Sequence, residues 1–455
     1  MAATSLKYTD INEIPKAHSR EAEGDIRCGQ NSASIVQRHQ LLQLARMIQE
    51  NAEAMQDAIF RDYGKQKLEV VIGELSPAVS ACINAANKLE EWAKPEKPVV
   101  EEWRSSWDTT IHKVPKGVAI IISPWNYPYI ISLAPLVGAI AAGCPVLLKP
   151  SEHTANVSTL YAELFPKYLD TDSYAVANGA IAETTCLLDL KWGSTSVGRV
   201  VAAAAAKQLT PVTLELGSKS PVYVDAENTD IELAAKRLLW AARSTRLCVS
   251  PDYILVPREH QDAFVTAIQK AYAQFYPNGA LDSTSTLTGG EVVAGGKEGA
   301  GKIEPTVVKN VSRDDPLLKG EIFGPIMPIV PVDGLEEAIK IIKSYGTPLV
   351  MHVFTESMET RDKFLYGTQS GTLVLNDRTD ADRLDTVYEM PFGGQGESGY
   401  GSYLGKYSFD TFTHQKSYIN VPLAAEPFLG YRYPPYTEEA YNFFAAGTFQ
   451  KIPDN

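Results

Sequence analysis

The stretch GVAIIISPWNYPYIISLAPLVGAIAAGCPVLLKPSE, residues 117–152, decides the fold. It opens with a continuous apolar run at residues 117–123, which is typical of a strand buried on both faces. The run PLVGAIAAG predicts a helix that stops at Gly143, and PVLLKP predicts a second buried strand. Two buried strands joined by a helix pair in parallel, so this stretch indicates an α/β fold.

The same alternation extends along the chain on both sides of this stretch. Upstream, apolar residues at helical spacing predict helices at about residues 37–60 and 68–92, and TTIHKVPKG predicts an exposed ribbon. Downstream, VSTLYAELFPKYL and TSVGRVVAAAAAKQ predict helices, while YAVANG and PVTLEL predict strands. A second α/β set is expected from about residue 220 to residue 421. The pattern as a whole predicts a doubly wound parallel sheet.

Composition limits the class of protein. A chain of 455 residues predicts two or three domains, and a formal net charge of −13 argues against a generic nucleic-acid binder. The five cysteines are an odd number without a C-x-x-C pair, so neither a disulfide framework nor a metal site is expected. We see no signal peptide and no uninterrupted apolar run long enough to cross a bilayer, so a cytoplasmic location is expected.

Polar side chains follow each of the two strands in the opening stretch. Ligands of open α/β sheets bind at the carboxyl ends of strands, so Lys149 and Glu152 could meet the hydroxyls of a ribose. Asn126 could donate its amide N–H to a developing oxyanion. The structural alternatives are a surface ion pair for Lys149 with Glu152 and a proline-bounded turn for Asn126.

Two glycine-rich segments have the look of cofactor loops. GSTSVG, residues 193–198, opens an Ala-rich helix whose free N–H groups could hold a pyrophosphate, although purely structural helix caps look similar. GQGESG, residues 394–399, fits a dinucleotide-loop spacing, but it follows MPFG rather than a buried strand. We therefore expect an ordinary glycine-rich loop at the second segment.

Three further residues are candidates for chemistry. Glu215 ends the apolar strand of LELGSKSP, where a carboxylate is costly unless solvated or paired, so a general-base role is plausible. EIFGP places Glu321 close to an aromatic residue. Cys248 is either a nucleophile or a buried thiol, and Arg246, with Arg243, would lower its pKa if close in space.

Taken together, these motifs resemble the aldehyde dehydrogenases. The resemblance is carried by PWNYP, LLKPSE, GSTSVG, LELGSKSP, the cysteine followed by VSPDYIL, EIFGP and PFGGQGESGYGSYLGKYSFDTFTHQKS. DYIL, GSYLGKYSF, FTHQKS and YRYPPY resemble the class 3 branch, which includes fatty-aldehyde and aromatic-aldehyde enzymes. The similarity extends from about residue 16 to residue 436.

The resemblance implies a role for each matching residue. Cys248 matches the nucleophile, which forms a thiohemiacetal and then a thioester. Asn126 matches the oxyanion donor, and Glu215 matches the base that activates water. The cofactor residues match as follows: Glu321 and Phe323 at the nicotinamide, Lys149 and Glu152 at the adenosine ribose, and Ser194 at the pyrophosphate.

The resemblance also implies the cofactor, the domains and the assembly. NAD is expected over NADP because Glu152 should repel a 2′-phosphate, although class 3 members often accept both. An NAD(P)-binding domain of Rossmann-like type is expected at residues 1–217, with 108–116 in an oligomerisation ribbon. A catalytic domain is expected at 218–405, and an oligomerisation strand with a C-terminal tail at 406–455. The bridging strands implied by the resemblance are TTIHKV and SFDTFTHQKSYINV. The implied protein is a homodimer without a transmembrane anchor, its partner being a small-molecule aldehyde.

The chain departs from the family pattern near the expected site. The approach ARSTRLC lacks the family's glycine, Ser218 replaces a second glycine, and the segment after DSTS is short. No strand is expected before GSTSVG, where the family has one. Two other functions therefore stay open: a catalytically impaired relative that acts as a binding protein, and a cofactor-independent, esterase-like hydrolase that uses Cys248 and Glu215.

Overall fold

The structure is a computed structural model, and it describes residues 8–9, 32–180, 194–242, 247–279, 298–299, 302–377, 387–448 and 451–453. The chain forms two units. Unit 1 comprises Met1–Trp92 and Pro115–Thr413, and unit 2 comprises Ala93–Val114 and His414–Asn455. The functional boundaries expected at residues 217 and 405 stay predictions.

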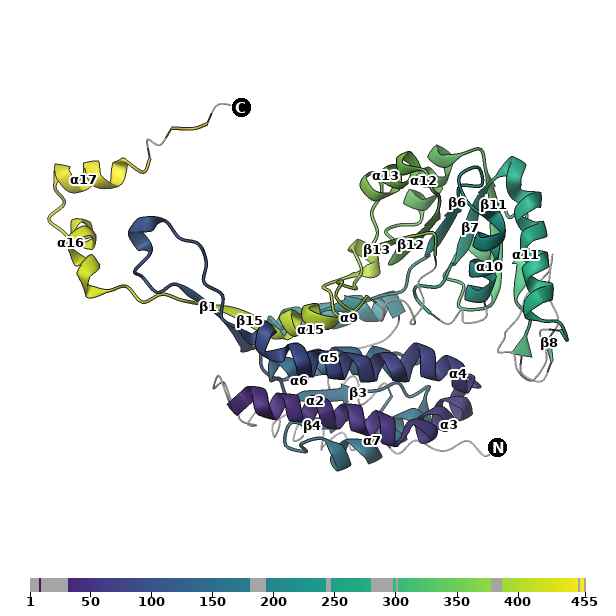
Figure 1. Cartoon of the computed structure of the whole chain (residues 1–455), viewed down its shortest axis with the longest axis horizontal. Helices are drawn as coiled ribbons and strands as arrows, with labels where there is room; N and C mark the ends of the chain where they lie inside the picture. Colours follow the sequence, from purple (N-terminus) through teal and green to yellow (C-terminus); the bar gives the residue numbers. More distant parts are fainter. Residues whose placement is uncertain are drawn as a thin grey trace. The chain divides into compact units, whose positions relative to one another are not determined.

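The opening stretch of sequence folds into a parallel sheet of strands β2, β3 and β4. The strands are β2 Ala119–Ile122, β3 Val146–Lys149 and β4 Tyr174–Val176, and the crossover helices are α6 Ile130–Ala142 and α7 Ala155–Tyr168. Both crossovers advance in the same direction, so right-handed connections put α6 and α7 on the same face. This confirms the predicted βαβ unit (Figure 1).

Strand β2 differs from the prediction that it would be buried on both faces. Ile121 is buried, whereas Ile120 and Ile122 are 36% and 37% exposed. Successive side chains of a strand point to opposite faces, and β2 lies at the edge of the three-stranded sheet. The unbroken apolar run therefore predicted the strand correctly. It did not predict that the second face of the strand is partly exposed.

The N-terminal helices pack on this sheet's helical layer. Helix α2 Ser32–Glu50 contacts α6 and α7, and α3 Ala52–Tyr63 contacts α7. A continuous helical segment follows, made of α4 Lys67–Val70, a π-helical turn η1 Val71–Leu75 and α5 Ser76–Ala93. The break at Asn51 divides the first predicted helix in two, while the second has the predicted extent apart from the π turn.

The segment Lys67–Ala93 is the one described segment that reaches the length and apolarity of a membrane span. Its buried residues include Ala78, Cys82, Ala85 and Leu89, which lie in the core of unit 1. A buried core helix meets the same criterion, so the segment carries no argument about a membrane. The cytoplasmic location stays a prediction.

A second sheet of six strands is wholly parallel, in the order β10-β11-β7-β6-β12-β13. Its strands are β6 Pro221–Val224, β7 Tyr253–Pro257, β10 Thr306–Val308, β11 Ile326–Val332, β12 Val350–Phe354 and β13 Thr372–Leu375. Its helices are α10 Ile231–Ala242, α11 Gln261–Phe275, α12 Leu335–Ser344 and α13 Met358–Gly367.

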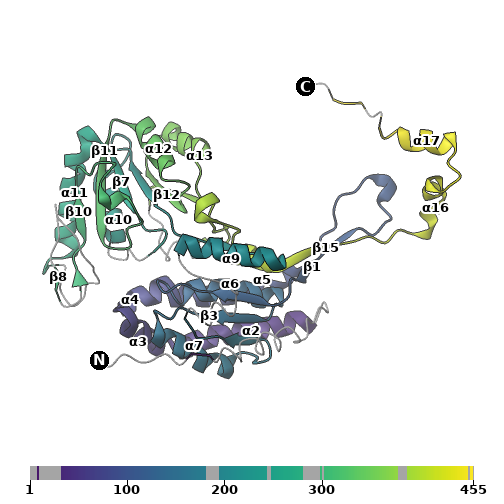
Figure 2. The same cartoon turned by 180° about the vertical axis from the view of Figure 1, so that it is seen from behind.

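Two apolar clusters cover opposite faces of this sheet. Val222 and Ile254 pack with α10 and α11, whereas Tyr223 and Leu255 pack with α12 and α13. Figure 1 shows α10 and α11 on one side of the strands and α12 and α13 on the other, and Figure 2 shows the same arrangement from behind. Alternate side chains of one strand thus reach both layers, which confirms an α/β fold with helices on both faces.

Short elements complete unit 1. Helix α9 Ser194–Gln208 and strand β5 Leu214–Glu215 precede the second sheet, and β5 pairs antiparallel with β14 Gly399–Tyr400. A small hairpin pairs β8 Glu298–Gly299 with β9 Lys302–Ile303. Helix α15 Gly405–Phe412 includes the residues SFDTF, which we had assigned to a bridging strand. That prediction was wrong, since the strand begins only at Thr413.

Unit 2 is built on the pairing of β1 Thr110–Pro115 with β15 Thr413–Tyr418. A bridge between Glu96 and Ile111 and a hydrogen bond from Asn420 N to Trp107 O (3.0 Å) extend the ribbon. Helices α16 Glu426–Leu429 and α17 Glu438–Ala445 lie in the C-terminal segment. The predicted ribbon at TTIHKVPKG is therefore confirmed as a strand.

Candidate active site

Sheet order brings together the loops that carry three predicted site residues. Glu215 lies shortly before β6, Cys248 before β7 and Phe323 before β11. These three strands are neighbours in the order β11-β7-β6, and they are parallel. Their amino ends therefore meet at one edge of the sheet, which gathers the three loops there.

Cys248 lies in a turn at this edge. Its thiol is free and the residue is partly buried. Its carbonyl oxygen accepts a hydrogen bond from Ser220 Oγ (3.3 Å), and His352 Nε2 lies 3.1 Å from the carbonyl oxygen of Val249. The turn is thus held to the amino-end loop of β6 and to β12. Residues 243–246, with Arg243 and Arg246, lie outside the described residues.

Glu215 is held by the short β5–β14 pairing, in which it lies opposite Gly399. Gly399 has a φ of +118°, and a Cβ there would lie 2.0 Å from the carbonyl oxygen of Leu214, so only glycine allows this close approach. The Glu215 carboxyl accepts a hydrogen bond from the backbone of Gly394, in the segment we had predicted to be an ordinary glycine-rich loop. That loop's role is to present a donor to the acid.

Burial alters the protonation of Glu215. Its Oε1 atom is buried and has no hydrogen-bond partner in the described part of the chain. Desolvation raises the pKa of Glu215 to about 8, although the Gly394 hydrogen bond lowers it. A carboxyl group with a pKa near ambient pH can both accept and release a proton, as a general base must.

The electrostatic surroundings of Cys248 are acidic. Burial raises the pKa of the Cys248 thiol, and the nearby carboxylates of Glu215 and Glu321 raise it further. The expected lowering of that pKa by Arg246 and Arg243 falls on residues outside the described ones, so it stays a prediction. A thiol facing a carboxylate can pass its proton to it, and this arrangement can therefore support attack by sulfur.

The Glu321 loop faces the same edge. Desolvation, followed by the charge of Asp252, raises the pKa of Glu321 to about 7. The carboxyl lies over Gly217, where a Cβ would stand 2.4 Å from Glu321 Oε2. The ring of Phe323 lies 5.9 Å from that of Trp125, the residue before Asn126. This contact connects the Asn126 turn to the loops of the second sheet.

Asn126 is buried and its turn is firmly anchored. Tyr63 donates its hydroxyl to the carbonyl oxygen of Asn126 (2.8 Å). Lys65 lies 3.2 Å from the ring centroid of Tyr127, and Glu74 accepts a hydrogen bond from Tyr129 N (2.8 Å). Lys65 and Glu74 also form a buried ion pair at 2.7 Å. Three side chains from the α3–α5 region therefore fix the backbone that carries this amide.

A second group of residues lies at the carboxyl edge of the β2–β3–β4 sheet. Lys149 Nζ donates to Glu152 Oε2 at 2.8 Å. Burial raises the pKa of Glu152, but the hydrogen bonds from Lys149 and from its own backbone outweigh that effect, and the pKa lies below its ordinary value. The structure thus brings these two predicted residues together. Ser194 begins helix α9, and its side chain lies outside the described ones.

This edge fits a dinucleotide. Ser123 Oγ and Asn178 Oδ1 follow β2 and β4, and both are buried without a hydrogen-bond partner in the parts of the chain that the structure describes. Buried polar atoms without partners are costly, and a bound molecule with hydroxyl and amino groups would satisfy them. Helix α9 lies close to the Glu215 loop, because Gly198 packs on Leu216. The backbone N–H groups at the N-terminus of this helix could hold a phosphate.

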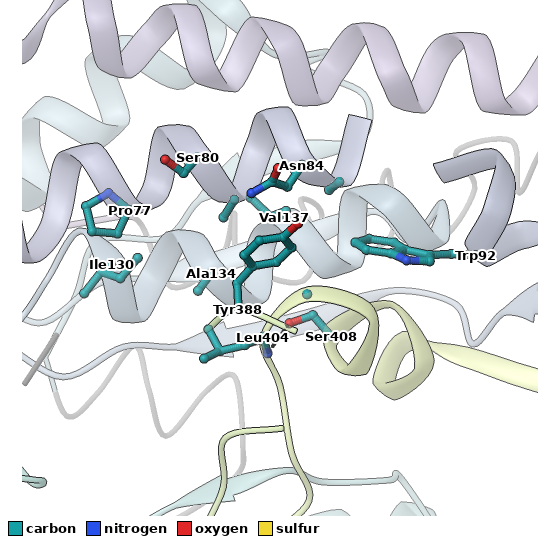
Figure 3. A pocket seen from close by; sticks show the side chains of 13 residues that line it. Pro77, Ser80, Asn84, Trp92, Ile130, Ala134, Val137, Tyr388, Leu404 and Ser408 are labelled. Carbon is teal, nitrogen blue, oxygen red and sulfur yellow. Dashed lines mark hydrogen bonds between the residues drawn. The ribbon is translucent and has the colours of Figure 1, made fainter. Parts of the chain in front are cut away.

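A small cavity lies elsewhere, between α5, α6 and residues 388–408 (Figure 3). Its volume is about 20 Å³, which is room for a water molecule. Figure 3 shows the Tyr388 ring between side chains of α5 and α6. No predicted site residue lines this cavity, so it is not the candidate active site.

Sequence reasoning missed the residues that support the site. Tyr63, Lys65 and Glu74 anchor the Asn126 turn, and Lys219 with Asp252 connects the loops around Cys248. The available signal was the presence of charged residues within apolar segments, such as Glu74 in VVIGEL. A buried charge predicts a partner, although local spacing does not say which one.

Known proteins match nearly the whole chain. The sequence model of the aldehyde dehydrogenase family matches residues 17–288 and 278–418. The chain is 38% identical to "Aldehyde dehydrogenase family 3 member B3" of Mus musculus over 435 residues, which are 90% of each protein. It is 38% identical to "Aldehyde dehydrogenase, dimeric NADP-preferring" of Rattus norvegicus over 421 residues, 87% of this chain and 92% of the relative.

A solved structure agrees. The substrate-bound state of Staphylococcus aureus AldH superposes with a TM-score of 0.87 at 31% identity, covering 96% of this chain and 99% of that one. The identity, coverage and fold agree with one another, so the chain is an enzyme that belongs to the aldehyde dehydrogenase family.

Proposed function

We propose that this enzyme oxidises an apolar aliphatic or aromatic aldehyde to the carboxylic acid, with NAD, or NADP in its place, as the oxidant. Cys248 is the nucleophile and Glu215 the base. The observation that carries this proposal is the acidic cluster around the thiol. Glu215 has a buried, unpartnered oxygen and a pKa of about 8, and its charge acts on Cys248.

In the first step Cys248 Sγ attacks the carbonyl carbon and its proton passes to Glu215. The side-chain amide of Asn126 and the backbone N–H of Cys248 donate to the oxyanion of the thiohemiacetal. The anchored turn at residues 126–130 supports this role, because a donor that is fixed in advance needs no reorganisation during the reaction.

In the second step the thiohemiacetal carbon loses a hydride and becomes a thioester. The bound cofactor supplies the acceptor for that hydride. Glu321 and Phe323 would hold the nicotinamide half, and Lys149, Glu152 and Ser194 would hold the adenosine ribose and pyrophosphate. The unpartnered atoms of Ser123 and Asn178 support binding of a polar ligand at that edge.

Before the last step Glu215 releases the thiol proton to the solvent and is ionised again. It then takes a proton from water, and the water oxygen attacks the thioester carbon. The acid leaves and the Cys248 sulfur is released. Glu215 must be ionised to accept this proton, and its pKa of about 8 makes the enzyme more active on the alkaline side of neutrality.

The cofactor preference follows from Glu152. Its carboxylate stays ionised and would repel a 2′-phosphate, which favours NAD. The pairing with Lys149 offsets part of this charge and leaves room for NADP, and a rat relative is named as NADP-preferring. Comparing kcat/KM for the two cofactors tests the preference, and a higher value for NADP would contradict it.

The assembly we propose is a homodimer through the β1–β15 ribbon, and the word "dimeric" in the rat relative's name supports it. Sedimentation at equilibrium tests this assembly. A monomer at micromolar concentration would contradict it.

The test of the activity is formation of the reduced cofactor with hexanal and with benzaldehyde. Cys248→Ala should abolish it, while Cys144→Ala, at a buried thiol on α6's C-terminal side, should keep it. If the parent is as inactive as Cys248→Ala, the chain is the impaired relative instead. Ester hydrolysis without any cofactor binding would favour the esterase-like alternative.

A further inference from the structure

A buried ion pair joins the loops that carry the base and the nucleophile. Lys219 and Asp252 form it, and their side chains are 10% and 2% exposed. Lys219 lies in the loop that follows Glu215, and Asp252 lies in the loop that follows Cys248. The pair thus spans the amino ends of β6 and β7.

The same pair holds a third loop. Lys219 Nζ donates to the carbonyl oxygen of Gly320 (2.7 Å), and Asp252 Oδ1 accepts from the backbone N–H of Ile322. These two backbone groups lie on either side of Glu321. The ion pair is therefore hydrogen-bonded to the backbone immediately before and immediately after that acid.

The Glu321 side chain rests on the first of these loops. Its Oε2 lies over Gly217, and the backbone of Ser218 donates to its carboxyl group. The Ser218 hydroxyl in turn accepts from Leu349 N (2.7 Å), which ties the loop to the start of β12. With both flanking backbone groups and the carboxyl held, the direction of Glu321 is fixed.

The nucleophile loop has its own attachment, which does not depend on the charged side chains. Asp252 N donates to Ser220 O (2.8 Å), and Ser220 Oγ donates to Cys248 O (3.3 Å). Substitution of the ion pair leaves these contacts in place, because they use backbone atoms and a serine. An experiment can therefore remove the ion pair without detaching the loop that carries the thiol.

We propose that Lys219 and Asp252 are positioning residues, which hold the loop of Glu321 and Phe323 against the Cys248 loop for the cofactor's nicotinamide half. This inference rests on the proposed function. Two charges buried as a pair seldom stabilise a fold more than apolar residues of the same size. Their geometry here, with a bond to each side of one acid, gives the pair a role in placing that acid.

The predicted consequence is selective. Without the pair, the loop at residues 320–323 loses two charge-assisted hydrogen bonds, so Glu321 and Phe323 no longer present a fixed surface. Hydride transfer and cofactor binding should weaken. Hydrolysis of 4-nitrophenyl acetate, which needs Cys248 but no cofactor, should continue.

The test compares Lys219→Met/Asp252→Asn with the parent. The double substitution leaves no unpaired buried charge, so it should fold. A matched control is Lys309→Met/Asp262→Asn, which removes an ion pair of the same composition (2.7 Å) at the surface between β10 and α11. We measure KM for NAD and kcat with an aldehyde, NAD binding by calorimetry, and ester hydrolysis in the absence of cofactor.

We expect KM and the dissociation constant for NAD to rise about tenfold or more, which is the scale of one charge-assisted hydrogen bond. Ester hydrolysis should stay within about twofold, and the control should match the parent in every measurement. Dehydrogenase and esterase rates that fall together, or that both stay unchanged, would overturn the inference. If the double variant fails to fold, Asp252→Asn alone must weaken NAD binding while ester hydrolysis is preserved. If it does not, the inference is overturned as well.

Failure of the proposed function looks different. In that case the parent hydrolyses the ester but neither binds nor reduces the cofactor. Parent and double variant would then be indistinguishable in calorimetry, and both proposals would fall. An active parent with an unaffected variant removes only the positioning role.

Discussion

Replacing Glu215 with glutamine should make the protein more stable at alkaline pH. The carboxyl group is partly buried and its Oε1 has no hydrogen-bond partner in the described chain. Desolvation raises its pKa from 4.5 to about 8. The folded state therefore holds this proton more tightly than the unfolded state does, across the interval between those two values.

The sign of the effect follows from linkage. Where the folded state binds more protons, stability falls as pH rises. The parent's contribution from Glu215 is intact below about pH 4.5 and is lost by about pH 8, whereas glutamine does not ionise. At about 1.4 kcal/mol per pKa unit the full loss is about 5 kcal/mol, and we expect about half because the residue keeps some contact with solvent.

The assay is urea unfolding of the parent and Glu215→Gln at about pH 5, pH 7 and pH 9. The variant's advantage in free energy of unfolding should grow by about 2–3 kcal/mol across this range. Glu163→Gln, on the exposed side of α7, is the control and should track the parent. Parallel curves for parent and Glu215→Gln would refute the assignment of a raised pKa to this carboxyl.

Other perturbations probe the same edge and its support. Gly217→Ala places a Cβ 2.4 Å from a carboxyl oxygen and should raise KM for the cofactor about fivefold or more, whereas Gly320→Ala, with open space at its Cβ, should not. Glu74→Gln leaves its lysine partner buried and unpaired and should lower the free energy of unfolding by about 3 kcal/mol, measured in urea; an unchanged midpoint would count against the buried pair.

Local pattern was sufficient for most of the secondary structure. Strands β3, β6, β7 and β12 are mainly apolar, although β3 ends in Lys149 and β12 contains His352, and all four are buried on both faces. Hydrophobic periodicity reports the environment of an element directly, so such strands can be recognised without knowledge of their neighbours. The strand at SFDTF was implied by the resemblance rather than by periodicity, and it was wrong because these residues end helix α15, which packs on α6.

Pairings over long sequence distances could not be read from the sequence. Strand β5 has two residues and is defined by β14, which lies far along the chain. The bonds of Lys219 to Gly320 and of Asp252 to Ile322 likewise join separate loops. Nothing in the local spacing selects these partners, and they depend on the strand order of the sheet. The raised pKa of the Cys248 thiol likewise reflects burial and the carboxylates of Glu215 and Glu321, which come from other loops.

The proposed site residues lie at opposite ends of the strands in the two sheets. Ser123 follows β2, Lys149 ends β3 and Asn178 follows β4, in keeping with the rule that ligands bind at carboxyl ends of parallel strands. The loops of Cys248 and Phe323 instead precede their strands. The carboxyl-end rule can therefore locate the proposed cofactor residues but not the loops of Cys248 and Phe323.

The grouping of the Glu215, Cys248 and Phe323 loops depends on strand order. Amino-end loops become neighbours only because β11, β7 and β6 are adjacent, although α11 and β10 separate β7 from β11 in the sequence. Loops brought together in this way share no local hydrogen-bonding pattern that could fix their mutual position. A buried cross-link between them is then the simplest means of holding the proposed nucleophile and the proposed cofactor-binding acid in register, and Lys219 with Asp252 forms such a cross-link.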